Sequence, residues 1–241
     1  MNSIFSYDSP MMQILTYIGD LIILNFLYLI CCVPVFTIGA AQAGMYTAMR
    51  VLNDKEDDSS AVAAFFRGFK SGFGKVTLSW LLILGIMALL AGVGVLAYVM
   101  QLPVWLCIAP ICICAIFQSL VPAFHSRFDC TAMQLIRNSW FLLIAHPLRS
   151  IATALLVWAP VLVLVIGGVY VFMMATPVWC TLYYSTAILF AELFLRKPFK
   201  TLVEEFNRRK AEEDAAAGIQ PEALPAESKK IFSDVPVEEE V

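Results

Sequence analysis

Two histidines and their neighbours are the residues of this chain whose types could hold a metal. Asp129 and Cys130 follow His125 closely, and His146 lies further along the chain. Imidazole and thiolate are ligands that zinc accepts. The spacing fits no structural zinc motif, so we interpret these residues as polar groups at the ends of apolar segments. We predict no metal and no cofactor.

The sequence contains none of the short motifs that are typical of catalysis. It has no GxSxG, HExxH, GxxxxGK[ST] or GxGxxG. The seven cysteines lie in or beside apolar segments without a CxxC spacing, so we interpret them as buried thiols that behave as small hydrophobes. These absences predict a protein that is not an enzyme.

Polar residues inside apolar runs form a second group of candidates, because such groups are costly in lipid and often functional. They are Asp20, Asn25, Gln42, Gln118 and Glu192. Hydrogen bonding between helices is the interpretation we favour over a transport path, since a proton or solute relay usually needs more than one deep carboxylate. Glu192 also precedes Arg196 by four residues, a favourable order for a pair on one helix.

The composition places these residues in a membrane protein. Hydrophobic residues make up 60% of the chain, charged residues 15%, and the mean hydropathy is +0.79. Soluble proteins have about 45–50% apolar and about 25% charged residues. Basic residues form no cluster of the kind that a nucleic-acid groove needs, so we predict the lipid bilayer, and not a nucleic acid, as a partner.

The apolar runs predict an all-α, polytopic membrane bundle of five to six transmembrane helices. Tight tips at Gln101–Leu102 and Met174–Thr176 divide four of the runs into two hairpins. Pro34 interrupts the chain after the first run, a turn is expected at Thr37–Gly39, and Ala40–Leu52 is either a short sixth span or an interfacial half-helix. The five clear runs are Ile14–Val33, Val76–Met100, Pro103–Phe124, Ile151–Met173 and Thr176–Leu195.

Lysine and arginine fall in the segments between hairpins and after the last run, which predicts that these segments and the C-terminus are cytoplasmic. Six spans would put the N-terminus inside, and five would put it outside. Within the loops, Ala61–Phe73 and Thr131–Ala145 read as two amphipathic helices that lie in the membrane interface. We divide the chain into a membrane domain, residues 1–200, and a charged tail, 201–241, that continues helically to about residue 217 and is then disordered.

Small residues recur every four positions at Ala40, Gly44 and Ala48, with Gly39 beside them. Such a face lets two helix backbones approach closely in lipid. Internal packing is its more common use, and binding of a partner helix is the alternative.

Three segments carry a family resemblance: GDLIILN from Gly19 to Asn25, CVPVFTIGAAQAGMY from Cys32 to Tyr46, and FFRGFK from Phe65 to Lys70. They resemble the YesL family (DUF624), over about residues 10–200. The resemblance implies a multi-pass protein of the bacterial plasma membrane, often encoded near carbohydrate ABC-transport components and without an established activity. Asn25, Pro34, Thr37 and Gly39 carry the family pattern.

Two functional hypotheses follow. The first is a non-enzymatic accessory protein that associates with permease subunits of a sugar ABC transporter. It is motivated by the resemblance, the missing ATP site and the small-residue face around Gly44. The second is a small transporter or channel that uses the broken helix at Pro34–Gly39, because interrupted helices often line binding sites. A membrane enzyme ranks third, since no nucleophile, base or metal constellation supports it.

Overall fold

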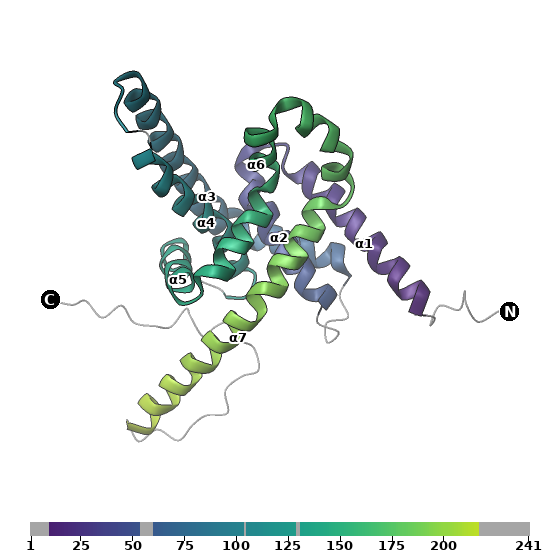
Figure 1. The fold of residues 1–241 in the computed structure, drawn as a ribbon. Helices are drawn as coiled ribbons and strands as arrows, with labels where there is room; N and C mark the ends of the chain where they lie inside the picture. Colours follow the sequence, from purple (N-terminus) through teal and green to yellow (C-terminus); the bar gives the residue numbers. More distant parts are fainter. Residues whose placement is uncertain (1–9, 54–59, 104, 129–130, 217–241) are drawn as a thin grey trace.

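The computed structural model describes residues 10–53, 60–103, 105–128 and 131–216, and it contains no strand within them. The predicted all-α class is confirmed (Figure 1). In chain order the elements are α1 (Pro10–Cys31), the 3₁₀ turn η1 (Val35–Thr37), α2 (Ile38–Asn53), α3 (Ala61–Val99), α4 (Trp105–His125), α5 (Ala132–Ala145), α6 (Pro147–Val178), the π-helical segment η2 (Trp179–Tyr183) and α7 (Tyr184–Ala216).

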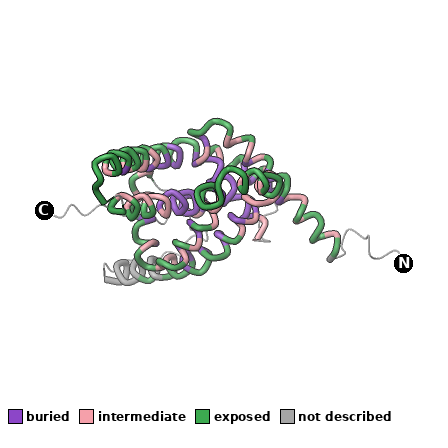
Figure 2. Tube along the Cα trace, turned by 45° about the horizontal axis from the view of Figure 1, so that its top comes forward, coloured by how far each residue is buried: buried purple, intermediate pink, exposed green. Residues whose placement is uncertain are grey.

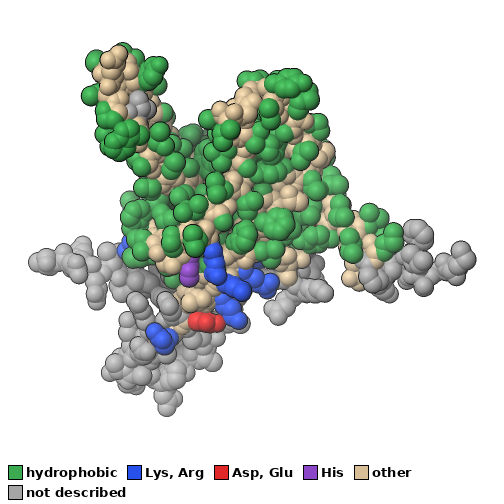
Figure 3. All heavy atoms as spheres, viewed as in Figure 1, with side chains coloured by type: hydrophobic (Ala, Val, Ile, Leu, Met, Phe, Trp, Pro, Cys, Tyr) green, Lys and Arg blue, Asp and Glu red, His purple; other side chains and the backbone are tan. Residues whose placement is uncertain are grey.

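Within the described residues, four helical stretches are long and apolar enough to cross a membrane. They indicate a multi-pass membrane protein, as the composition predicted. Figure 3 shows the matching surface: hydrophobic side chains cover the upper parts of the molecule, and the visible Lys and Arg side chains gather at its lower end. The stretches are Met11–Cys31, Ala61–Val99, Trp105–His125 and Pro147–Glu204, the last of which is 58 residues long and folds back on itself.

The helix α2 lies at the centre of the molecule and is buried over most of its length. Its 16 residues include the predicted segment Ala40–Leu52, but the helix is shorter than the four stretches that could span a membrane. The prediction of a turn at Thr37–Gly39 is wrong. Thr37 ends the 3₁₀ turn and Gly39 already lies inside α2, because Pro34 alone is enough to end α1 and redirect the chain.

The prediction that Ala61–Phe73 is a separate amphipathic helix is also wrong. This segment is the first part of α3, which runs without a break into the apolar residues that follow. Ser60 caps the helix by accepting a hydrogen bond from the Ala63 amide at 3.2 Å, and no proline interrupts the 39 residues beyond it. Phe65 is fully buried against α2, whereas Phe66 and Phe73 of the same segment are exposed, so only part of this segment packs in the protein.

The second amphipathic segment does form its own helix, α5. Thr131 and Gln134 make a capping box at its start, in which the Thr131 hydroxyl accepts from the Gln134 amide. Trp140 is half exposed and stacks on Phe117 of α4 at 5.3 Å between ring centroids.

Of the two predicted hairpins, the first is confirmed and the second is wrong in its position. α3 and α4 are joined by a short turn in which Gln101 has a φ of 57°. The residues Met174–Thr176 are helical instead of forming a tip. The chain bends at Gly168, whose φ of 74° and ψ of 178° belong to a backbone region that is essentially restricted to glycine.

The helices cross near the middle of the molecule, and buried residues concentrate there while the ends are exposed (Figure 2). The hairpin of α3 and α4 projects away from the bend in α6, and the space-filling view shows an open notch between the two (Figures 1 and 3). The helix α7 continues past Lys200 to Ala216, as we predicted for the charged segment after residue 200. The segment 218–241, predicted to be disordered, lies outside the described residues.

Candidate functional site

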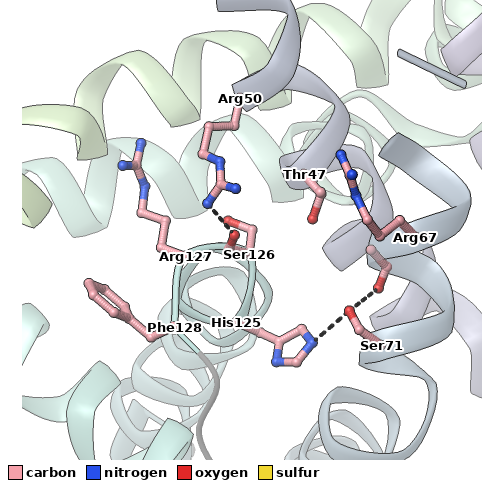
Figure 4. A pocket seen from close by; sticks show the side chains of 9 residues that line it. Thr47, Arg50, Arg67, Ser71, His125, Ser126, Arg127 and Phe128 are labelled. Carbon is pink, nitrogen blue, oxygen red and sulfur yellow. Dashed lines mark hydrogen bonds between the residues drawn. The ribbon is translucent and has the colours of Figure 1, made fainter. Parts of the chain in front are cut away.

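A pocket of about 100 Å³ lies where α2 ends, α3 begins and α4 ends (Figure 4). We call it the polar-end pocket. Its lining is basic and polar, in contrast with the apolar surface of the spans. The lining residues are Thr47 and Arg50 from α2, Arg67, Gly68 and Ser71 from α3, and His125, Ser126, Arg127 and Phe128 from the end of α4 and the residues after it.

Arg50 fixes the end of α4. Its Nη1 donates to the backbone carbonyl of Ser126 at 2.7 Å, across 76 positions of sequence. The last carbonyl groups of a helix have no partner within the helix, and a cation there also interacts favourably with the helix dipole. This contact joins α2 to α4 at the edge of the pocket.

Ser71 and His125 form the opposite wall. The Ser71 hydroxyl lies 3.1 Å from the Gly68 carbonyl and 3.3 Å from Nε2 of His125. Because the hydroxyl has one proton, both contacts are satisfied when Ser71 donates to Gly68 and Nε2 of His125 donates to Ser71. The imidazole thereby ties α4 to α3.

Arg127 connects the pocket with α7. Its Nη2 pairs with Oε1 of Glu192, and its guanidinium lies 4.9 Å from the centre of the Phe199 ring. The side chains of Arg127 and Glu192 are 18% and 3% exposed, so the ion pair is largely buried. A buried pair of this kind is costly to break, because the remaining charge keeps its desolvation cost.

Tyr46 lies next to this pair and is fully buried. Burial raises the pKa of its phenol, and the charge of Glu192 raises that pKa further. The phenol therefore stays neutral at any physiological pH. Its hydroxyl has no hydrogen-bond partner among the described residues.

Three arginines around one small pocket favour the binding of an anion, since guanidinium groups recognise carboxylates and phosphates through paired hydrogen bonds. Within the described residues, no group of three His, Cys, Asp or Glu side chains could hold a metal ion. Of the metal candidates from the sequence, Asp129 and Cys130 lie outside the described residues, and His146 lies between α5 and α6.

Asn25 makes the most specific contacts of the predicted positions. Its amide nitrogen donates to the Cys180 carbonyl at 2.7 Å and to the Trp179 carbonyl at 3.3 Å, and its oxygen accepts from the Ser185 amide at 3.1 Å. A π-helical turn shifts the normal hydrogen-bond pattern of a helix. Asn25 thus satisfies backbone groups of η2 and of the start of α7 from a neighbouring helix.

The break between α1 and α2 contains Pro34 and Thr37, and Gly39 follows it in the first turn of α2. The Thr37 hydroxyl lies 2.5 Å from the Cys31 carbonyl oxygen and 2.6 Å from the Pro34 carbonyl oxygen, and its single proton serves one of them at a time. Because the Thr37 amide also donates to the Pro34 carbonyl at 3.0 Å, the hydroxyl can donate to the Cys31 carbonyl, which the break releases. A Cβ added at Gly39 would lie 2.7 Å from Cβ of Trp80.

The remaining predicted positions lie apart from the pocket. Gly44 packs on the backbone of α3, where an added Cβ would lie 2.7 Å from the Phe65 carbonyl oxygen. Asp20 lies on α1 and is partly exposed. Gln118 of α4 is 2% exposed, and neither polar atom of its amide has a hydrogen-bond partner among the described residues.

The sequence singled out one lining residue, His125, and Glu192 beside the pocket, but it did not predict the pocket itself. Of the arginines, Arg67 was assigned to an amphipathic segment and the others only marked cytoplasmic loops. The available signal was that Arg50, Arg67 and Arg127 each stand within a few residues of an end of an apolar or small-residue run. Nothing in the spacing indicates that these ends meet.

Comparison with known proteins is consistent with this description. Residues 21–92 match the family described as Protein of unknown function, DUF624. The match confirms the resemblance over less than a third of the chain, from the second half of α1 through α2 into α3. No curated protein and no solved structure matches the chain.

Proposed function

We propose that this multi-pass membrane protein has no enzymatic activity of its own and works by associating with another membrane protein. The partner class is the permease subunit of a carbohydrate ABC transporter of the bacterial plasma membrane, which the resemblance to the YesL family suggests. The charged end that carries the polar-end pocket faces the cytoplasm in this proposal, together with the C-terminus, because cytoplasmic segments hold the excess of Lys and Arg.

The observation that carries the proposal is an open face on the projecting part of α3. Gly85, Ala88 and Gly92 are all exposed, and a Cβ added at Gly85 or Gly92 would have no atom within 4 Å. They recur at intervals of three and four residues and so share one side of the helix. In lipid, small residues on one side let a second helix approach closely, which larger side chains prevent.

Co-purification from native membranes tests the association. Replacing Gly85 and Gly92 together by isoleucine fills the open face, and we expect the permease subunit to be lost from the purified complex. Gly74→Ile is the matched control, because Gly74 is equally open but lies near the charged end of the same helix. Recovery of the wild-type protein without any transporter subunit would contradict the proposal.

A small transporter or channel is the second candidate, and the interruptions of the helices favour it. Besides the break at Pro34, the chain bends at Gly168 and widens to a π-helix at Trp179–Tyr183. Interrupted helices line the substrate sites of many transporters. Flux of sugars into proteoliposomes would support this function, and purified protein that carries no flux would count against it.

A further inference from the structure

We infer that α5 lies in the interface of the lipid bilayer and that its exposed side binds anionic phospholipid. The helix has 14 residues, about 21 Å, and is too short to cross a membrane core of about 30 Å. It nevertheless exposes four large apolar side chains, of which Met133 is the most exposed at 74% and Trp140 the least at 46%; Phe141 and Ile144 lie between them. A contiguous apolar surface of this kind marks a contact with lipid or protein.

The two sides of α5 are reversed with respect to a helix on the surface of a soluble protein. Such a helix turns its apolar side to the core and its polar side to water. In α5 the buried side carries two polar side chains beside two leucines, whereas the exposed side is mainly apolar. The buried residues are Leu135, Asn138, Ser139 and Leu142. This reversal indicates that the exposed side contacts lipid instead of water.

Both ends of α5 lie at a similar depth along the spans. α4 ends at His125 and α6 begins at Pro147, and the two helices run in opposite directions (Figure 1). Nε1 of Trp158 donates to the Ala115 carbonyl at 3.0 Å, which joins the helices eleven residues after the start of α6 and ten residues before the end of α4. At 1.5 Å per residue these lengths are about 16 Å and about 15 Å. A helix that connects two ends at one depth lies across the spans, as an interfacial helix does.

The exposed side of α5 is followed in the chain by the apolar surface of a span. Only His146 separates α5 from α6. The first part of α6 exposes Leu148, Ile151 and Leu155, which recur at intervals of three and four residues and so share one side of the helix. α6 belongs to a stretch that is long and apolar enough to cross a membrane, so lipid covers these side chains. Because α5 meets the foot of this span, the same bilayer is the cover within its reach.

Arg137 gives this surface its preference for an anionic lipid. It is exposed, one turn after Met133 and two turns before Ile144, so it stands in the middle of the apolar side. An arginine can lay its methylene groups along an apolar surface and carry its guanidinium to a phosphate. Residues 131–150 contain Arg137 and Arg149 but no Asp or Glu, so the charge of this segment complements an anionic headgroup.

Quenching of Trp140 by brominated lipid tests the position of α5. The full chain is reconstituted in vesicles of phosphatidylcholine whose acyl chains carry bromine near the headgroup. Trp140 is one of five tryptophans, so its emission is obtained as the difference between the wild-type protein and Trp140→Phe, a variant that keeps an aromatic ring against Phe117. We expect the brominated lipid to quench most of this difference.

Two other results would overturn the inference. Quenching of Trp140 by aqueous acrylamide but not by brominated lipid would place the exposed side of α5 in water. Quenching by neither would mean that protein covers this side, and in vesicles that contain this chain alone the cover would be a second copy.

The lipid preference is measured in equimolar vesicles of phosphatidylcholine and phosphatidylglycerol, with the bromine on one lipid or on the other. We expect stronger quenching of Trp140 when phosphatidylglycerol carries the bromine, and we expect Arg137→Gln to reduce this preference by about fivefold. Lys200→Gln is the matched control, because Lys200 is exposed on another helix, α7, and the variant loses the same charge. Equal quenching by the two lipids in the wild-type protein, or an equal reduction in both variants, would overturn the binding of anionic lipid by α5. The inference does not depend on the proposed permease partner, because the vesicles contain no other protein.

Discussion

The pair α2 and α3 and the pair α6 and α7 are held together in opposite ways. Where α2 meets α3, backbone approaches backbone: Gly44 faces the Phe65 carbonyl, and Gly68 faces Thr47. Where α6 packs against the π-helical segment η2 that leads into α7, side chains donate to backbone groups instead, as the Tyr183 hydroxyl does to the Leu156 carbonyl at 2.8 Å. The first contact depends on the absence of side chains, and the second depends on particular ones.

The difference follows from the regularity of the backbone. α2 is a regular helix, so its own carbonyl groups are satisfied and its surface is free to pack closely in the way that small residues allow in lipid. The region from Gly168 to Tyr184 contains a bend and a π-helical turn, and its backbone needs partners from outside. The two regions should therefore respond to different substitutions.

Breaking the ion pair between α7 and the residues that follow α4 should have the largest effect. Glu192→Leu on α7 removes the partner of Arg127, which stays largely buried, and the expected loss of stability is about 3–5 kcal/mol. Chemical unfolding in mild detergent measures it. Glu204→Leu, an exposed position on the same helix, is the control. The double variant Arg127→Met with Glu192→Leu should recover much of the loss, and failure to recover would mean that the charge of Arg127 is not the cause.

Filling the contact between α2 and α3 should come next. Gly44→Val places methyl groups against the Phe65 carbonyl and its ring, and we expect a loss of about 2–3 kcal/mol from overpacking, measured by the same unfolding experiment. Gly74→Val adds the same side chain to α3 where no atom lies within 4 Å. If both variants unfold at the same denaturant concentration, close backbone packing does not stabilise this region.

The irregular region should instead respond to the loss of a single polar side chain. Asn25→Leu leaves the carbonyls of Trp179 and Cys180 without this donor and the Ser185 amide without its acceptor, which should cost about 1–2 kcal/mol. Hydrogen exchange should speed up locally at residues 179–185. Thr181→Val removes only a bond within one helix and should leave this exchange unchanged. Uniform acceleration along the chain would contradict the assignment.

The sequence predicted the regular region better than the irregular one. The local pattern of apolar and small residues is enough to predict three features. They are α1, the hairpin of α3 with α4, and the helical spacing of Gly44 with its small neighbours. The bend at Gly168 could not be predicted from hydropathy, because the apolar run continues across it without a change. The tip predicted at Met174–Thr176, between two apolar runs, is instead part of α6.

The pocket was beyond prediction for a different reason. Each of its arginines obeys the general rule that basic residues flank apolar segments, so each had an adequate explanation as a marker of topology. Only the three-dimensional meeting of three helix ends, for which the contact of Arg50 with Ser126 is the evidence, turns these separate markers into one site.

The smallest expected effect lies at the bend itself. Gly168→Ala forces an L side chain into a φ of 74° with ψ of 178°, and we expect a cost of about 1 kcal/mol or a straighter α6. No atom lies within 4 Å of an added Cβ, so the cost would be purely conformational. Gly85→Ala, in an open and regular helical position, should be neutral or slightly stabilising by comparison. A spin-label distance between α1 and the end of α6 would reveal straightening of α6. Straightening should weaken the contact of Asn25 with η2. If neither this distance nor the stability changed, the bend would not require glycine.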